Sequence, residues 1–217
     1  MYQKKFDEIA NEVKKILKES PRCHAWEHTV RVICNAKKLA ELEKDVNMKV
    51  IELGALLHDI ARADEMAIKG KICHAKRGAK LADEILKKYD INDKMRKQIV
   101  RCVRTHRYND NKTPESIEEK IIFDADKLDS IGAIGIGRAF MFAGHLGAKL
   151  HNSKEDAINS PSYSENDTAY REFLVKQRFI PKKMFTRAGR LMAEEKVEFM
   201  KLFFKQMDRE IGSIEFN

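Results

Sequence analysis

The sequence predicts an all-α protein of about 8–10 helices, and three observations support this prediction. Four prolines and ten glycines among 217 residues leave long stretches without a helix breaker. Apolar residues in most of these stretches recur with the spacing of one helix face. Alternating apolar and polar runs, which are typical of strands, do not occur, and there is no internal repeat. We therefore expect a single helical bundle.

The first half of the chain shows five helical patterns. They cover residues 2–19, 26–40, 47–61, 74–86 and 92–106. The segment "SPR" ends the first helix, and Asn92 is a good N-cap for the fifth because its side chain can accept from the backbone. His28 lies four residues before Val32, on the apolar stripe of the second helix.

Strong start signals precede the next predicted helix. Thr113 and Pro114 suit its N-cap and first position, and Ser116 with Glu119 offers a capping box. The glycine-rich "GIGRAFMFAGHLGAKL" predicts a helix that packs closely on a neighbour. Its Gly135-x-Gly137 lacks the third glycine and the preceding strand of a dinucleotide fingerprint. Polar, turn-rich residues 151–168 predict a loop or lid, and the last two helices are expected at 169–180 and 184–211.

Composition narrows the class of protein. A net charge of +8 favours an anionic partner, but lysines alternate with glutamates and no basic run exceeds two residues, so a nucleic-acid tail is not expected. No pair of cysteines has CxxC spacing, which argues against a zinc knuckle. No apolar run reaches the roughly 18 residues of a membrane span. We expect a cytoplasmic protein with no membrane segment.

Ionisable side chains occupy apolar helix faces where they should be costly. "LGALLHDIAR" places His58 and Asp59 together at the buried end of a helix, and burial of such groups needs compensation. Further candidates are His28, His74, His106 and an acid within "FDADKLD". Imidazole and carboxylate together form a ligand set for Mn, Fe, Zn, Co or Ni. The residues alone do not choose between Asp124, Asp126 and Asp129.

The order His28, then His58-Asp59, then Asp126 resembles the HD-domain superfamily of metal-dependent phosphohydrolases. "HAWEHTVRV", "ALLHDIAR" and "CHAKRGAKLADEIL" are similar to the family's histidine regions. "FDADKLDSIGAIGIGRAF" and "KKMFTRAGRLMAEEKVEFM" resemble a bacterial and archaeal subset related to nucleotide pyrophosphohydrolases. The resemblance covers about residues 20–205.

The resemblance implies a ligand set and a domain plan. It assigns His28, His58, Asp59 and Asp126 as ligands of a divalent metal (Mn, Fe, Mg, Co, Ni or Zn). It implies one HD domain over 1–217, with a core at about 20–150 and the C-terminal helices 165–211 packed on it.

The number of metals is a separate question. Some relatives hold a second metal with two further histidines, and His74 and His106 occupy the corresponding places. In the subset resembled, one metal is expected, and the two imidazoles would contact phosphate or move protons. We favour one metal per chain.

The sequence also departs from the family's patterns. Members that cut guanosine tetraphosphate carry an acidic pair where this chain has Arg62 and Ala63. The cyclic-dinucleotide branch carries a GYP segment, which is missing. The subset resembled has a histidine before its "FxxK" run, where this chain has Glu172.

Charged side chains near these motifs are candidates for catalysis. Arg62, one turn beyond the doublet, could stabilise charge on a phosphate, and Asp64 could act as a general base. Lys127, Arg138 and Lys176 are candidate substrate contacts. For each of them a surface or capping role is the alternative.

The resemblance predicts hydrolysis of phosphoester or phosphoanhydride bonds in nucleotides, with pyrophosphate release from (deoxy)nucleoside triphosphates favoured. The alternative activities are a nucleoside monophosphate phosphatase and a dinucleotide hydrolase. A non-catalytic nucleotide- or RNA-binding HD module is the rival from another class, and the intact ligand set argues against it. The expected partner is a small nucleotide, and a homodimer is left open.

Overall fold

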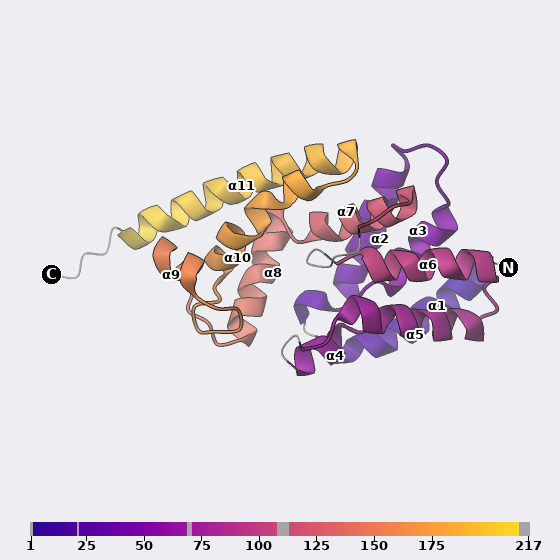
Figure 1. Ribbon diagram of the computed structural model, residues 1–217. Coiled ribbons are helices and arrows are strands. Elements are labelled where there is room, and N and C mark those ends of the chain that lie inside the picture. Colours follow the sequence, from indigo (N-terminus) through magenta and orange to yellow (C-terminus); the bar gives the residue numbers. More distant parts are fainter. Residues whose placement is uncertain (1, 21, 69–70, 108–112, 213–217) are drawn as a thin grey trace. The chain divides into compact units, whose positions relative to one another are not determined.

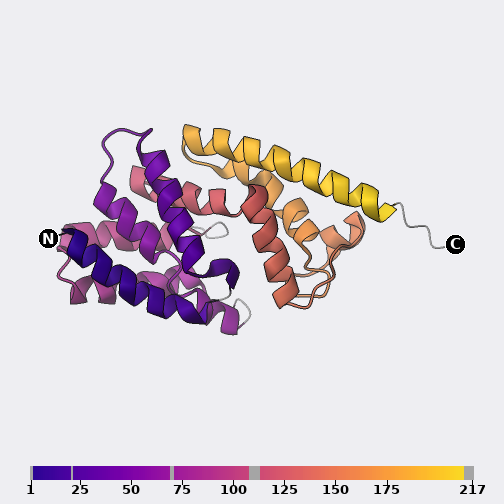
Figure 2. The ribbon, with the colours of Figure 1, turned by 180° about the vertical axis from the view of Figure 1, so that it is seen from behind.

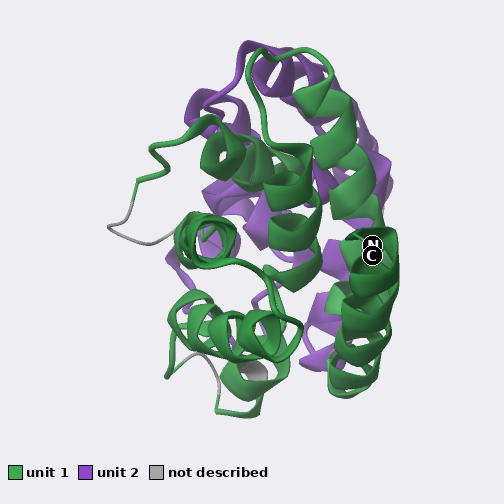
Figure 3. Ribbon diagram, turned by 90° about the vertical axis from the view of Figure 1, so that its right-hand side faces the viewer, with its two compact units in different colours: residues 1–127 green, residues 128–217 purple. Residues whose placement is uncertain are grey.

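The computed structural model describes residues 2–20, 22–68, 71–107 and 113–212 (Figure 1). Throughout these ranges the secondary structure is helical and no strand occurs, which confirms the all-α prediction. The chain divides into two compact units, residues 1–127 and 128–217 (Figure 3). Within the described part, no helix is both long and apolar enough to cross a bilayer.

The first unit contains the N-terminal helices and most of α7. Their bounds are α1 (Tyr2–Ile16), α2 (Trp26–Ala40), α3 (Met48–Leu57), α4 (Arg62–Ala67), α5 (His74–Lys88), α6 (Asp93–Thr105) and α7 (Ile117–Asp129), with 3-10 turns at Leu17–Glu19 and Arg22–His24.

Helix α3 forms the centre of the first unit. It packs against α1, α2 and α6, while α5 packs against α4 and α6. The nearly continuous apolar sequence of α3 is buried, as expected for a helix surrounded by others. A side chain at Gly54 would lie 2.5 Å from Ile122 Cδ1 and 3.1 Å from Cys102 Cβ, so glycine permits this close approach. Helix α1, in indigo at the front of Figure 2, covers one side of the unit.

Capping residues set several helix starts in the first unit. The side chain of Asn92 accepts a hydrogen bond from the backbone N–H of Met95 at 3.0 Å, which confirms the predicted cap of α6. Ser116 Oγ accepts from the Glu119 N–H at 3.2 Å, and Glu119 Oε1 accepts from the Ser116 N–H at 3.4 Å. This is the predicted capping box. The predicted start at Thr113 and Pro114 was wrong, because the box begins the helix at Ile117.

The third predicted helix, 47–61, was too long. Helix α3 ends at Leu57, and a turn over residues 58–61 leads into the short α4, which the sequence analysis did not predict. This early end separates the side chains of the doublet from the regular helix and shapes the site.

The second unit contains the C-terminal helices. Their bounds are α8 (Gly132–His145), α9 (Lys154–Asn159), α10 (Ala169–Val175) and α11 (Arg187–Gly212), with a 3-10 segment at Gln177–Lys183. Helix α8 packs against α10 and α11, and α10 also packs against α9 and the 3-10 segment. In the core of the second unit, the rings of Phe173 and Phe204 stack with their centroids 4.7 Å apart.

Two predictions for the second unit need correction, and a third is confirmed. Residues 151–168 were expected to be a loop, but Ser153 accepts from the N–H of Asp156 at 3.0 Å and caps α9. The helix expected at 169–180 ends at Val175 and continues as a 3-10 segment. The predicted packing of the glycine-rich helix on a neighbour is confirmed, since α8 packs against α10 and α11. Of its glycines, Gly135 lies closely against the Ser130 carbonyl just before the helix, whereas a Cβ at Gly137 would meet nothing within 4 Å.

Candidate metal centre

The His58-Asp59 doublet lies where α3 ends. His58 Nδ1 lies 2.7 Å from the carbonyl oxygen of Ala55. A carbonyl can only accept, so Nδ1 carries the hydrogen and Nε2 of the neutral ring presents an electron pair. Neighbours on a regular helix point about 100° apart. At this helix end His58 Nε2 and Asp59 Oδ2 nevertheless lie 3.8 Å apart.

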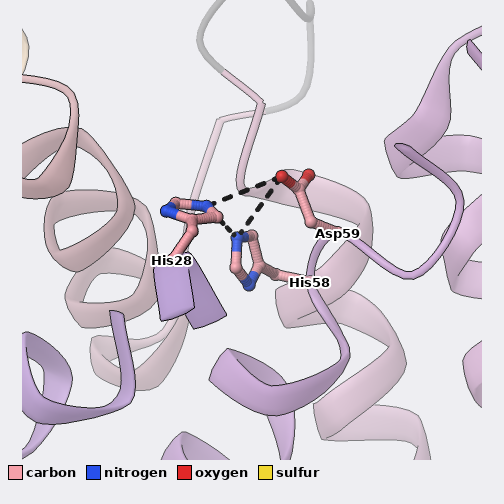
Figure 4. A group of neighbouring side chains, drawn as sticks. All are labelled: His28, His58 and Asp59. Atoms are coloured by element: carbon pink, nitrogen blue, oxygen red, sulfur yellow. Dashed lines mark hydrogen bonds and ion pairs between the residues drawn. The ribbon is translucent and has the colours of Figure 1, made fainter. Parts of the chain in front are cut away.

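Four side chains converge at this point, and we call them the metal group: His28 from α2, His58 and Asp59 from the end of α3, and Asp126 from α7. His28 Nε2 lies 3.1 Å from His58 Nε2 and 3.6 Å from Asp59 Oδ2. Figure 4 shows these three side chains pointing toward one another. Asp126 Oδ1 lies 3.6 Å from His28 Nε2 and 3.9 Å from His58 Nε2.

The metal group fits a divalent cation. Ligand atoms that each lie about 2.1 Å from one ion are separated by roughly 3–4 Å from one another, and the distances above fall in this range. His28, His58 and Asp59 can each offer one ligand atom to a common ion. Two carboxylates and two imidazoles form a mixed oxygen and nitrogen set that suits Mn, Fe, Co, Ni or Zn.

Burial and charge together set the protonation states of this group. Burial lowers the pKa of His58 to about 4, despite the opposing charges of Asp59 and Asp126, so the ring is neutral near pH 7. Burial alone would raise the pKa of Asp59, but His58 and Arg62 hold it well below its usual range. Burial would also raise the pKa of Asp126, but nearby charges, chiefly that of Lys127, hold it well below its usual range. Both carboxylates are ionised.

Lys127 is buried beside the metal group. Its Nζ donates to Asp126 Oδ2 at 2.6 Å and to the carbonyl of His106 at 2.9 Å, and it lies 4.7 Å from the centre of the Phe123 ring. From the sequence, Lys127 was a candidate substrate contact, with a surface side chain as the alternative. The structure places it inside the unit, where it holds one predicted ligand and the end of α6.

A second set of side chains uses the other oxygen of Asp59, and we call Asp59, His74 and His106 the imidazole group. Asp59 Oδ1 lies 3.3 Å from His74 Nε2 and 3.5 Å from His106 Nε2. The two Nε2 atoms are 3.1 Å apart, and His106 Nδ1 donates to the Val103 carbonyl at 2.7 Å. These three residues can also offer one ligand atom each to a common ion. Asp59 therefore joins the two groups.

A carboxylate that the sequence analysis missed lies behind the imidazole group. Glu65, on α4, is 3% exposed, and its Oε2 lies 2.7 Å from His74 Nδ1 and 2.6 Å from Arg62 Nη1. Its Oε1 lies 3.0 Å from Arg107 Nη2. Burial alone would raise the pKa of Glu65, but the hydrogen bond from His74 and nearby positive charges lower it.

Asp64 and Arg62, the two candidate catalytic residues near Glu65, lie in different surroundings. Asp64, the predicted general base, is 45% exposed and pairs with Arg77 on the surface at 3.1 Å, so the structure does not bring it to the site. Arg62 does reach the site: its Nη1 donates to Glu65 and lies 3.0 Å from His74 Nδ1, and its Nη2 lies 2.9 Å from His24 Nε2. Glu65 follows the buried Ala61 by four residues, and this spacing was the signal that could have identified it.

The remaining predicted substrate contacts belong to the second unit. Arg138 donates to the carboxylate of Asp129 at 2.9 Å and to its carbonyl at 3.0 Å. Lys176 donates to Glu172 at 2.6 Å, so the glutamate that replaces the expected histidine forms an ion pair one turn away.

The comparisons with known proteins identify the family. The HD-domain family model matches residues 25–131. YpgQ of Bacillus subtilis is 30% identical to this chain over 98% of its length and 96% of YpgQ. The chain belongs to the HD-domain family. The matched range contains every member of the metal and imidazole groups. As a member of this family, the protein is a metal-dependent phosphohydrolase.

Solved HD-domain structures extend the likeness to nearly the whole chain. The structure of B. subtilis YpgQ in complex with ADP has a TM-score of 0.72 and 28% identity, with 96% of each chain covered. An HD-superfamily hydrolase of Bacillus thuringiensis has a TM-score of 0.72 and 28% identity, covering 99% of this chain and 100% of that one. A predicted HD-superfamily hydrolase of an uncultured Thermotogales bacterium has a TM-score of 0.65 and 28% identity, covering 94% and 91%.

Proposed function

We propose that this HD-domain protein hydrolyses (deoxy)nucleoside triphosphates to nucleoside monophosphates and pyrophosphate, with one divalent cation bound by the metal group. The proposal rests on the carboxylate of Asp59, whose two oxygens face two groups of side chains in surroundings of different charge. One oxygen faces His28 and His58, and the other faces His74 and His106.

The charges favour a cation in one group and a phosphate in the other. The metal group has two ionised carboxylates, Asp59 and Asp126, with the ammonium of Lys127 against one of them. The imidazole group shares Asp59 but has Arg62 and Arg107 around the single carboxylate of Glu65. A negative phosphate is attracted to the second arrangement and a divalent cation to the first.

The reaction breaks a phosphoanhydride bond. A divalent cation supplies polarisation of a phosphoryl oxygen and a lowered pKa of water. The oxygen of water forms a bond to the α-phosphorus, and the bond from this phosphorus to the bridging oxygen breaks, so pyrophosphate leaves with that electron pair. In this proposal Nε2 of His74 or His106 takes the proton that the water loses. The protonated ring then donates this hydrogen to a phosphate oxygen.

The comparisons support a nucleotide as the substrate. YpgQ was solved in complex with ADP, which shows that a similar protein binds a nucleotide. A nucleoside monophosphate phosphatase or a dinucleotide hydrolase would use the same groups on a phosphoester, so the products distinguish these alternatives from pyrophosphate release. We also propose that the chain is one HD domain, as the sequence analysis predicted.

The test is a Mn²⁺ assay on nucleoside mono-, di- and triphosphates and dinucleotides, with the products separated by anion-exchange chromatography. We expect pyrophosphate and nucleoside monophosphate in equal amounts from triphosphates. The Asp59→Asn variant should be inactive. Asp83→Asn, a change at a carboxylate that pairs with Arg96 between α5 and α6, should be active. Orthophosphate from monophosphates, or cleavage of dinucleotides alone, would overturn the proposal.

A further inference from the structure

Glu65 is a buried carboxylate that the proposed reaction does not use. It comes from α4, six residues after Asp59, and its Oε2 lies 2.7 Å from Nδ1 of His74. Its other neighbours are the guanidinium groups of Arg62 and Arg107. A carboxylate held by two arginines is ionised, and an ionised carboxylate accepts hydrogen bonds but donates none. The hydrogen between Glu65 and His74 therefore belongs to the imidazole.

Two side chains of α4 meet Nδ1 of His74: Glu65 Oε2 at 2.7 Å, which can only accept, and Arg62 Nη1 at 3.0 Å, which can only donate. Arg62 Nη1 already donates to Glu65 Oε2 at 2.6 Å, and the shorter contact to the carboxylate places the hydrogen on Nδ1. A neutral imidazole has one N–H, and placing it on Nδ1 leaves Nε2 with a free electron pair. Nε2 is the atom that lies 3.3 Å from Asp59 Oδ1 and 3.1 Å from His106 Nε2. The opposite tautomer would direct an N–H into the imidazole group.

His74 differs from the other histidines in what holds it. His58 and His106 donate from Nδ1 to the main-chain carbonyls of Ala55 and Val103, which no substitution removes. His74 depends on a side chain from another helix. Its tautomer can therefore be changed by mutation at one position, and Arg62 and Arg107 fix the acceptor by pairing with its two oxygens.

We propose that Glu65 is a positioning residue that fixes His74 as the Nδ1–H tautomer, so that Nε2 presents its electron pair at the imidazole group. The effect on the reaction rests on the proposed function, in which His74 or His106 takes a proton from water. The tautomer itself does not depend on that function. Carboxylates that orient a functional histidine in this way change affinity or activity by 10- to 100-fold when they are removed.

The experiment compares two substitutions of similar size. Glu65→Gln keeps an oxygen that can accept from His74, whereas Glu65→Met fills the space without an acceptor. The matched controls are Glu118→Gln and Glu118→Met at the start of α7, where a glutamate of similar burial accepts from the Asn47 N–H at 3.0 Å. The controls report the general cost of losing a buried carboxylate in the same unit.

The primary measurement is the tautomer of His74. It is determined by long-range ¹H–¹⁵N NMR of histidine-labelled protein loaded with Zn²⁺, which is diamagnetic, with the His74 signals assigned from a His74→Gln variant. We expect the hydrogen on Nδ1 in the wild type, in Glu65→Gln and in both controls, and its loss from Nδ1 in Glu65→Met. Hydrogen on Nε2 in the wild type, or an unchanged tautomer in Glu65→Met, would overturn the proposal.

The second measurement is kcat/KM with nucleoside triphosphates. Glu65→Met should lower it by about 10- to 100-fold with the bound metal retained, and Glu65→Gln should recover most of the loss. Equal rates in Glu65→Met and the Glu118 controls would overturn the effect on the reaction. If the wild type hydrolyses no nucleotide, the proposed function fails, but the NMR result still decides whether Glu65 sets the tautomer. The wild-type spectrum gives that answer even if Glu65→Met does not fold.

Discussion

The two sides of Asp59 carry similar side chains in surroundings of different charge. On the Oδ2 side, the metal group adds a second carboxylate, Asp126, to two histidines. On the Oδ1 side, the imidazole group adds two histidines and no further carboxylate, and arginines pair with Glu65 behind it. The geometry of a histidine pair beside a carboxylate is therefore similar on both sides, and the difference lies in the surrounding charge. The surrounding charge makes one side suited to a cation and the other suited to an anion.

The largest effect should follow from changing the residue that both sides share. Asp59→Asn removes the negative charge from the metal group and from the imidazole group together. We expect loss of the bound metal and a fall in kcat/KM of at least about 10³-fold, the scale seen when a central catalytic group is removed. Elemental analysis and steady-state kinetics measure both. Full metal content in this variant would contradict the sharing of Asp59.

Lys127→Met tests the charge balance of the metal group through stability. Lys127 and Asp126 form a buried ion pair, and removing one partner of such a pair costs about 3–5 kcal/mol. We expect the free energy of unfolding to fall by about this amount in EDTA. With Mn²⁺ the loss should be smaller, because the cation compensates the same carboxylate. Urea unfolding in both conditions measures this, and an equal loss in both would contradict a cation beside Asp126.

Matched histidine variants test whether the two sides differ in function. His58→Gln should lose the metal, whereas His74→Gln should retain it and lower kcat by about 10²-fold, the usual contribution of a group that transfers a proton. Metal content and kcat are measured on the same preparations. Equal loss of metal in His74→Gln and His58→Gln would contradict a difference in function between the two groups.

A smaller effect is expected at Arg62, whose guanidinium bridges Glu65 and His24 and also lies 3.0 Å from Nδ1 of His74. Arg62→Lys keeps the charge but cannot reach both neighbours with one ammonium group. We expect retained metal and a fall in kcat of about 10-fold, with Arg62→Ala nearer to 100-fold. If Arg62→Ala has the kcat of the wild type, then the anchoring of Glu65 does not matter to the reaction.

The sequence predicts the helices and the inward histidines better than it predicts the connections between helices. His28, His74 and His106 were predicted to face inward, and the structure buries each of them. Periodicity is enough for such residues because the regular helix fixes their direction. The choice of Asp126 over its neighbours came from the resemblance to HD domains, since several acids of that segment face inward.

The residues that were missed lie where regular helix gives way to a turn. Helix α3 was expected to continue to residue 61, and with that geometry the direction of Asp64 and Glu65 could not be assigned. The turn after Leu57 directs Glu65 to His74 and leaves Asp64 in solvent. The burial of Lys127 is also not visible in the sequence, because its partners, Asp126 and the His106 carbonyl, belong to different helices.

The number of divalent cations per chain distinguishes one metal bound by the metal group from two metals that share Asp59. Wild-type protein is loaded with Mn²⁺, freed of loosely bound metal by gel filtration, and analysed for metal and protein, with Asp59→Asn as the metal-free control. We expect one Mn²⁺ per chain, bound by His28, His58, Asp59 and Asp126, and the same value in His74→Gln and His106→Gln. Two Mn²⁺ per active chain, falling to one in either variant, would contradict this expectation and assign the imidazole group to a second metal.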